Sequence, residues 1–309
     1  MSNREHRSTY FFLTLAMIFW GLSFVWYKQA LVHFGPISLV FFRLLISLPL
    51  IAVVSLSMGR LKKVFKADIP YFLLLAFFEP LAYFLGESFG MLYLSSTVAS
   101  VIIATIPLFT SLVAFWFLKE KLFLHNYMGM LVSFAGVLFV VFSDRASLAA
   151  TWKGILLISV AVVSAIGYGM VIKRIAGRYN SLTIVTIQNL IGAIYFLPLV
   201  FLFELKKLTA ANWSFQMLLP VLYLSVFAST IAYVGFIQGV RKLGISKASI
   251  FANFIPVFTA IFAFIILKEK VSFYKIIGIV FVIAGLIMSQ AVRKDEHKKP
   301  EEIIIDELY

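Results

Sequence analysis

The sequence predicts an all-α integral membrane protein with ten transmembrane helices, arranged as two inverted-topology five-helix repeats with both termini cytoplasmic. Composition, an internal repeat and the positions of Lys and Arg lead to this prediction. Of the 309 residues, 62% are hydrophobic and 13% are charged, and the mean hydropathy is +0.99. Soluble domains have roughly 45–50% apolar and 25% charged residues, so a soluble globular domain and a disordered chain are both excluded. A membrane helix needs about 20 apolar residues, and the supply suffices for roughly nine or ten.

The first five candidate helices are separated by charged residues, Gly and Pro. They span residues 10–31, 36–57, 70–92, 97–118 and 122–142. Each is a continuous apolar run, whereas a membrane β-strand alternates apolar and polar residues over about ten positions. We expect residues 1–9 to form a cytoplasmic N-terminus and residues 10–142 to form the first repeat.

A polar stretch, residues 143–153, divides the chain and is expected to be an external linker. The next five candidate helices span residues 154–173, 181–203, 213–239, 246–267 and 272–291. Together they form the second predicted repeat, residues 154–291. The charged tail, residues 292–309, is expected to lie in the cytoplasm.

The second half of the chain repeats the first. With a shift of 149 residues, positions 92–142 face positions 241–291, and by our count 16 of 51 are identical. The identities include a proline (Pro107, Pro256), a Lys-Glu-Lys triplet (119–121, 268–270) and a pair of glycines (Gly129 and Gly136, Gly278 and Gly285). Five spans is an odd number, so the second half must enter the membrane from the opposite side. Inverted repeats are typical of secondary transporters, because two such halves can exchange conformations.

Lys and Arg are unevenly distributed between the predicted loops. Of the 27 basic residues, 18 fall on the side of the termini and 8 on the other side, and Arg43 falls inside a span. Cytoplasmic loops carry an excess of Lys and Arg, so we expect both termini in the cytoplasm. We interpret the formal net charge of +13 as membrane topology and not as a surface for nucleic acid. The predicted location is the cell membrane, with the lipid bilayer as partner.

At its framework positions the sequence resembles the drug/metabolite transporter superfamily, in its ten-helix EamA-type branch. The resemblance covers about residues 10–291. The residues that carry it are Trp20-Gly21-Leu22-Ser23-Phe24 with Lys28, then Arg43, then Ala99-Ser100 with Pro107 and Ala248-Ser249 with Pro256, and the four glycines of the repeat.

The resemblance implies a secondary transporter of a small organic solute that works by alternating access. Relatives export amino acids, other metabolites or drugs on one framework, so we expect an exporter of amino acids or related small metabolites. We expect no cofactor and no enzymatic activity. The compact ten-span build fits a bacterial inner membrane.

Three ionisable residues, Arg43, Glu79 and Glu87, lie at membrane depth, where such groups are functional hypotheses by default. At 1.5 Å per residue, Arg43 and Glu87 lie about 6–10 Å below the outer surface and Glu79 lies near the midplane. We expect Arg43 to pair with Glu87, or failing that with Glu79. The alternative is that Arg43 is structural or reaches the outer headgroups. Glu79 can face one cavity with Tyr83 and Glu87, and can carry a proton or bind an ammonium group.

Aromatic and amide side chains extend the candidate site to other helices. The aromatic candidates lie deep in spans one, three, six and eight, where they can stack on a planar substrate or hold an amine. The amides offer neutral hydrogen bonds from the second half. The alternatives are plain packing and contact between helices. The substrate-binding candidates are therefore Trp20, Glu79, Tyr83, Glu87, Tyr168, Gln188, Tyr233 and Asn253.

Arg43, Pro107 and Pro256 are the structural or gating candidates. Proline removes a backbone hydrogen bond and can kink a helix, so equivalent prolines in spans four and nine predict a paired hinge. The alternative is a static bend. The glycine pairs put small residues on one face of spans five and ten, which permits close approach within one protomer or across a homodimer.

Other function classes find less support. The sequence holds no cysteine, no Gly-x-x-x-x-Gly-Lys-[Ser/Thr] motif and no His-Glu-x-x-His motif. It therefore offers neither an ATP-hydrolysing site nor a metal centre. One alternative is a receptor or scaffold without transport, which would not need two inverted halves. A membrane-embedded lipid-modifying enzyme is a weaker alternative, because it needs a polar cluster at the membrane surface.

Overall fold

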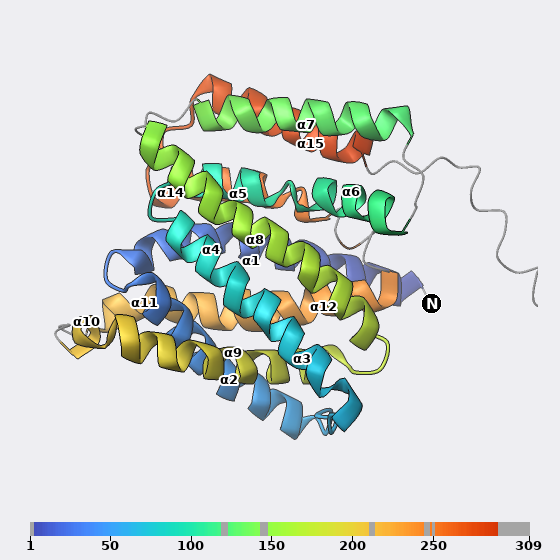
Figure 1. Cartoon of the computed structure of the whole chain (residues 1–309), viewed down its shortest axis with the longest axis vertical. Helices are drawn as coiled ribbons and strands as arrows, with labels where there is room; N and C mark the ends of the chain where they lie inside the picture. The colour runs from blue at the N-terminus through green and yellow to red at the C-terminus, as the bar shows by residue number, and fades with distance from the viewer. Residues whose placement is uncertain are drawn as a thin grey trace, which may run out of the picture.

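The computed structural model describes residues 3–118, 123–142, 148–209, 214–243, 248 and 251–289. The regular structure in this part of the chain is helical (Figure 1). By length and hydropathy, seven of the described helices can cross a membrane, and three shorter apolar helices complete the predicted ten spans. The Lys119–Lys121 triplet, residues 143–147 of the expected linker and the tail 292–309 lie outside the described residues.

Spans one and two are unbroken helices. α1 is Asn3–Leu31 and α2 is Pro36–Ser57. α1 begins well before residue 10, so the described part of the expected N-terminal segment is helical. α2 has the predicted bounds, because Pro36 fits the first turn of a helix, where its missing N–H has no intrahelical partner.

The third span is interrupted at Glu79, although the sequence predicts one continuous helix. A short turn, η1 (Lys66–Asp68), leads into α3 (Ile69–Ala76), a wide turn η2 (Phe77–Ala82) and α4 (Tyr83–Gly90). Glu79 has an extended backbone, with φ −147° and ψ 116°. Pro80 has no N–H to donate to the preceding turn, which is why the helix opens here.

Spans four and nine break at equivalent positions. The helices concerned are α5 (Ser96–Ile103), α6 (Ile106–Leu118) and α14 (Ile255–Ile266). Turns at residues 104–105 and 253–254 lie 149 residues apart, and each is followed within two or three residues by Pro107 or Pro256. The paired interruption predicted from the prolines is present. Its role as a hinge stays a prediction.

The remaining spans follow the predicted order with small shifts of their ends. α8 begins before residue 154, so residues 148–153, expected in the linker, are helical. α11, η3 and α12 follow one another without a gap and form span eight. The bounds are α7 (Leu124–Phe142), α8 (Leu148–Ile175), α9 (Ser181–Phe203), α10 (Leu205–Thr209), α11 (Phe215–Tyr223), η3 (Leu224–Ala232), α12 (Tyr233–Leu243) and α15 (Phe273–Ser289).

Equivalent spans of the two halves pack side by side and antiparallel, as an inverted repeat requires. In α7 and α15, Gly129 lies against Gly285 and Gly136 lies against Gly278. In α2 and α9, Ser47 contacts Asn189, and Ser55 contacts Thr186. In both pairs the residue number rises in one helix while it falls in the other.

Packing between the halves follows the same symmetry. α1 packs against span eight (η3 and α12) and against α14 of span nine. The equivalent helix of the second half, α8, packs against span three (α3, η2 and α4) and against α5 and α6 of span four. The two first spans thus cross into the opposite half, which joins the repeats into one bundle (Figure 1).

The glycine pairs serve the contact between α7 and α15, which lie together at one edge of the bundle (Figure 1). A Cβ atom at Gly285 would lie 2.3 Å from Ser133 N, and one at Gly136 would lie 2.6 Å from Gly278 O. Such distances leave no room for a side chain. Of the two alternatives left open by the sequence, the glycines are therefore used within one protomer.

Candidate functional site

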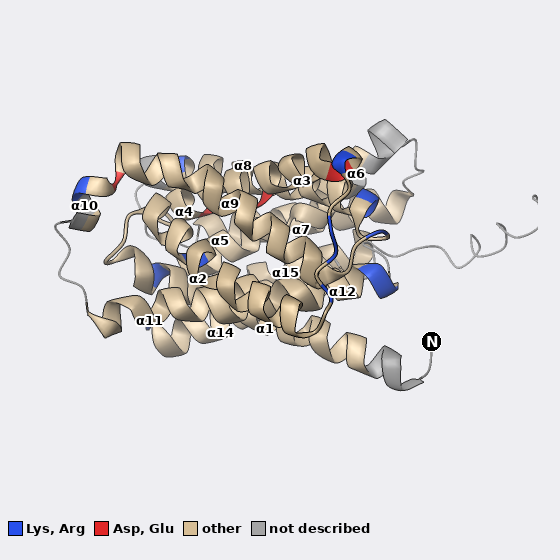
Figure 2. Ribbon diagram, turned by 90° about the horizontal axis from the view of Figure 1, so that it is seen from below, with Lys and Arg blue, Asp and Glu red and all other residues tan. Residues whose placement is uncertain are grey.

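The three ionisable residues predicted at membrane depth are all buried in the helical bundle. The exposed fraction is 2% for Arg43, 8% for Glu79 and 4% for Glu87. Their charges act on one another, so they form a single electrostatic cluster. Figure 2 shows that most other Lys and Arg residues lie toward the two ends of the helices. The cluster therefore gathers three ionisable side chains inside the bundle, apart from the basic residues at the helix ends.

Arg43 does not form the predicted ion pair with Glu87, nor one with Glu79. Its Nε donates to Ser229 Oγ, its Nη1 donates to Tyr27 OH at 3.2 Å, and its guanidinium carbon lies 4.1 Å from the centroid of the Phe84 ring. Among the described residues, an ion pair forms between Arg178 and Asp68 and not at Arg43. Hydroxyl groups from α1 and η3 and an aromatic ring take the place that the sequence assigned to a carboxylate.

Glu87 lies one helical turn after Tyr83 and accepts a hydrogen bond from the Tyr83 hydroxyl at 3.4 Å. Tyr27 interacts electrostatically with both Glu87 and Arg43. Its hydroxyl also accepts a hydrogen bond from Ser88 Oγ at 3.3 Å. Tyr27 thus interacts with both the buried cation and the Glu87 carboxylate.

Glu79 connects the first half of the chain to the second. The Tyr233 hydroxyl donates to Glu79 Oε1, and the Tyr233 ring lies edge-on to Trp20 with centroids 5.3 Å apart. Trp20 in turn donates from Nε1 to the carbonyl of Ala228 at 3.3 Å. These contacts bring three of the predicted residues together at the interruption of span three.

Tyr168 and Gln188 form a second contact beside this cluster. The Tyr168 hydroxyl donates to Gln188 Oε1 at 3.2 Å, and Tyr168 interacts electrostatically with Glu79. The neighbouring amide, Asn189, donates to Ser47 Oγ at 3.0 Å and joins α9 to α2. Of these two adjacent amides, Gln188 belongs to the candidate site and Asn189 to the contact between helices.

Asn253 forms no hydrogen bond with the other predicted residues within the described part of the chain. It lies in the interruption of span nine and is 1% exposed. Its Nδ2 and Oδ1 are both buried without a hydrogen-bond partner among the described residues. Buried polar side chains are nearly always hydrogen-bonded, so an amide with neither atom satisfied is a position where a bound solute could supply the partner.

Sequence reasoning missed four residues that contact Arg43 or lie beside its partners. Tyr27, Phe84 and Ser229 contact the Arg43 side chain directly, and Ser88 binds Tyr27. Serine and single aromatic residues are common in membrane helices, so composition gives no signal for them. Tyr27 alone had a signal, because it is next to Lys28 in the framework motif of span one.

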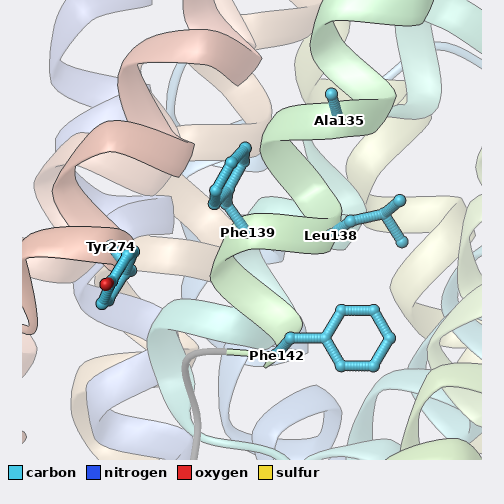
Figure 3. Close-up of a pocket in the computed structure, with 5 residues that line it drawn as sticks. All are labelled: Ala135, Leu138, Phe139, Phe142 and Tyr274. Carbon is cyan, nitrogen blue, oxygen red and sulfur yellow. The ribbon is translucent and has the colours of Figure 1, made fainter.

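An apolar groove of about 460 Å³ lies far from this chemistry, on α7 and α15 (Figure 3). Its lining is Ala135, Leu138, Phe139, Phe142 and Tyr274. Phe142 is 63% exposed and Tyr274 is 60% exposed, as expected of side chains that face lipid. We take the buried polar cluster as the candidate functional site, because ionisable groups at membrane depth are costly and are functional hypotheses by default.

Two inverted five-helix halves around a buried polar cluster are the architecture of a membrane transport protein. The model of the EamA-like transporter family matches residues 7–142 and 152–290. The chain therefore belongs to this family and is a multi-pass membrane transporter, as its framework residues predict.

The similar proteins come from bacteria and archaea. An uncharacterized transporter of Archaeoglobus fulgidus is 28% identical over 282 residues, covering 91% of this chain and 98% of the relative. The uncharacterized transporter YcxC of Bacillus subtilis is 26% identical over 287 residues, covering 91% of this chain and 92% of the relative. A crystal structure of a protein superposes with a TM-score of 0.70 at 15% identity, over 91% of this chain and 98% of that chain. This likeness shows a shared fold.

Proposed function

We propose that this protein exports amino acids or related small metabolites by alternating access. The observation that carries the proposal is the environment of Arg43. This guanidinium is 2% exposed and has no carboxylate at ion-pair distance among the described residues, although Glu79 and Glu87 belong to the same cluster. A buried cation normally acquires an anionic partner, so a carboxylate of the solute is a fitting one.

The opposite charges of the cluster suit a zwitterion. An amino acid offers its carboxylate to Arg43 and its ammonium group to Glu79 or Glu87. Trp20 and Tyr233 supply aromatic surface next to Glu79, which can hold an amine by a cation–π contact. Asn253 offers a free donor and a free acceptor from the second half.

Alternating access is supported by the contacts at one end of spans four and nine. Glu269 follows α14 and accepts hydrogen bonds from Ser96 N at 2.9 Å and Thr97 Oγ1 at 3.0 Å, at the start of α5. All three residues lie on the predicted external side. We infer that this contact closes that side, and that the interruptions before Pro107 and Pro256 let spans four and nine bend when it opens. Each repeat, residues 10–142 and 154–291, contributes one of the two bending spans.

Proton coupling through Glu79 is part of the proposal. Glu79 is buried and interacts electrostatically with Glu87. It also accepts a hydrogen bond from the Tyr233 hydroxyl, and this bond changes when the carboxylate takes up a proton. A carboxylate that loads a proton loses its attraction for an ammonium group, which links proton binding to solute release. The outward direction of transport rests on the family.

Counterflow in proteoliposomes tests the proposal. Vesicles loaded with unlabelled solute are given labelled amino acids, organic cations or sugar phosphates, with and without a pH gradient. We expect accumulation of an amino acid in the wild type and at least a tenfold loss in Arg43→Gln, because a buried charged contact is lost. Glu79→Gln is expected to keep exchange and lose the response to the pH gradient.

Arg60→Gln is the matched control, because it removes an exposed arginine and is expected to leave counterflow unchanged. Amino-acid counterflow that survives Arg43→Gln would contradict the assignment of the carboxylate to Arg43. A folded wild-type protein that accumulates no solute of the panel would favour a receptor or scaffold.

A further inference from the structure

A small pocket lies on the predicted cytoplasmic side, between the start of span three and the end of span six. Its volume is about 270 Å³, and its lining is Ala67, Asp68, Tyr71, Arg174, Ile175 and Arg178. Asp68 directly precedes α3, and α8 ends at Ile175. The pocket therefore lies where two membrane helices meet the headgroup region, well away from the buried cluster around Arg43.

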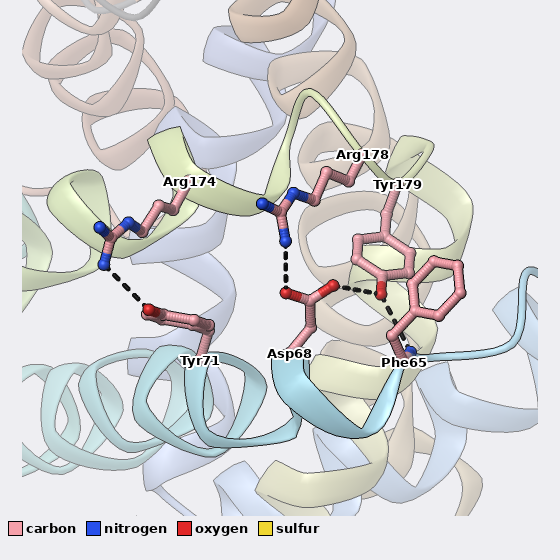
Figure 4. A network of polar contacts seen from close by, with 6 residues as sticks. All are labelled: Phe65, Asp68, Tyr71, Arg174, Arg178 and Tyr179. Atoms are coloured by element: carbon pink, nitrogen blue, oxygen red, sulfur yellow. Dashed lines mark hydrogen bonds and ion pairs between the residues drawn. The ribbon is translucent and has the colours of Figure 1, made fainter.

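The carboxylate in this pocket is already satisfied. Asp68 accepts from Arg178 Nη1 at 2.8 Å and from the Tyr179 hydroxyl at 2.7 Å, and it is 2% exposed (Figure 4). Burial and the contact with Asp68 raise the pKa of Tyr179, which keeps this hydroxyl protonated as a donor. Asp68 thus serves the fold and does not repel an anion that enters the pocket.

The two arginines keep free donor capacity. Arg178 gives Nη1 to Asp68, but its side chain is 66% exposed. Arg174 donates from Nη1 to the Tyr71 hydroxyl at 2.9 Å, and its guanidinium carbon lies 5.2 Å from the Tyr71 ring centroid (Figure 4). A guanidinium has five N–H donors, so both side chains retain donors for a further acceptor. Tyr71 fixes the plane of Arg174 and so prepares it to bind a tetrahedral anion.

We propose that this pocket binds the phosphate group of an anionic phospholipid. Arg174 and Arg178 provide the charge and the hydrogen bonds, and the boundary position of the pocket brings a headgroup within their reach. Basic pockets between membrane helices on the cytoplasmic side suit such headgroups. The site is independent of the solute pathway proposed above.

Apolar side chains next to the η1 turn distinguish a lipid from a free phosphate. Phe65 is 69% exposed and Ile69 is 44% exposed, and they flank the η1 turn that carries Asp68. Acyl chains cover such side chains, whereas inorganic phosphate leaves them in water. Inorganic phosphate presents the same anion, so it is included in the test.

Native mass spectrometry of the detergent-purified protein measures the binding. The protein is titrated with phosphatidylglycerol, with phosphatidylcholine and with inorganic phosphate as a competitor. We expect tighter binding of phosphatidylglycerol than of phosphatidylcholine. Arg174→Gln is expected to weaken phosphatidylglycerol binding about fivefold, which is the worth of one basic residue near an anionic lipid.

Lys173→Gln is the matched control, because it removes the same charge from an exposed neighbour on α8 that does not line the pocket. Arg174→Gln leaves the contacts of Asp68 intact, so loss of fold is not the expected cause of weaker binding. An equal loss in Lys173→Gln, or equal affinity for the two lipids, would overturn the proposal. Displacement of the lipid by an equal concentration of inorganic phosphate would also overturn it, in favour of a soluble anion.

Discussion

Glu269 Oε2 accepts a hydrogen bond from Thr97 Oγ1 at 3.0 Å, and this contact ties the end of span nine to the start of span four. The second oxygen, Oε1, accepts from Ser96 N at 2.9 Å. A carboxylate at a helix N-terminus is favourable, because it satisfies unpaired N–H groups and meets the positive end of the helix dipole. The two halves of the transporter are thus joined at the predicted external side.

We expect Glu269→Gln to open the external side more often. The substitution removes the charge from two hydrogen bonds and weakens the contact by about 1.5 kcal/mol, which is about tenfold in the open population. The chain has no cysteine, so a single Ser100→Cys substitution, one turn below Thr97, reports on access without background. Labelling by a membrane-impermeant maleimide added outside is expected to accelerate about tenfold.

Glu204→Gln in the same Ser100→Cys background is the control for this experiment. Glu204 makes a similar contact at the start of α2. This contact joins spans two and seven, which pack along their length, and it involves neither span four nor span nine. Unchanged labelling is expected there. If Glu269→Gln labels at the wild-type rate, the contact does not limit opening.

Glu204 itself is expected to stabilise the fold. Its carboxylate accepts from Ser38 N at 2.8 Å, from Ser38 Oγ at 2.6 Å and from Ile37 N at 3.2 Å, and it is 5% exposed. Glu204→Ala leaves these donors buried and unsatisfied, so we expect a loss of about 2–3 kcal/mol in the free energy of unfolding. Chemical unfolding in detergent measures it, and Glu204→Gln should cost clearly less. Equal costs would mean that the charged carboxylate, which both variants remove, is what matters and that the neutral amide of Gln does not replace it.

Gly285→Ala is expected to separate α7 from α15. Its Cβ would lie 2.3 Å from Ser133 N and 2.5 Å from Gly129 O, and backbone atoms cannot move aside without a shift of the helix. Overpacking of this kind costs about 1–3 kcal/mol, measured as a lower midpoint of thermal unfolding. Gly177→Ala is the control, because no atom lies within 4 Å of its added Cβ. A loss that grew as the protein was diluted would instead indicate a contact between protomers.

The sequence predicted the spans well where helix ends carry local signals. α2 and α9 have the predicted bounds, 36–57 and 181–203, because Pro36 begins one helix and the Asn180 side chain caps the other. Hydropathy could not reveal the interruption at Glu79, since the apolar run continues through it. It becomes visible only when Pro80 and the backbone of Glu79 are placed in the fold.

The candidate site was predicted in its members but not in its contacts. Depth along a helix placed Arg43 and Glu87 at similar levels, yet it gives no information on the direction in which each side chain leaves its helix. Arg43 therefore contacts Tyr27 and Ser229, from spans one and eight, instead of the expected carboxylate. Partner choice depends on how the helices pack, which hydropathy does not encode.

A comparison of Asn253 with Asn189 distinguishes a solute-binding amide from a structural one. Both polar atoms of its side chain are buried without a partner among the described residues, whereas Asn189, which is 4% exposed, donates to Ser47 at 3.0 Å. Asn253→Leu removes unsatisfied groups, so we expect the free energy of unfolding to stay the same or rise by about 1–2 kcal/mol. Amino-acid counterflow is expected to fall at least tenfold, because the solute loses its partner in the second half.

Asn189→Leu is the matched control for this prediction. It has the same change in shape but breaks an existing hydrogen bond, so it should lower the free energy of unfolding by about 1–2 kcal/mol. Chemical unfolding and counterflow are measured on both variants. If Asn253→Leu loses as much stability as Asn189→Leu, Asn253 has a structural partner and not a solute. If Asn253→Leu keeps both stability and counterflow, the solute does not contact this amide, and recognition rests on Arg43 and the two buried carboxylates.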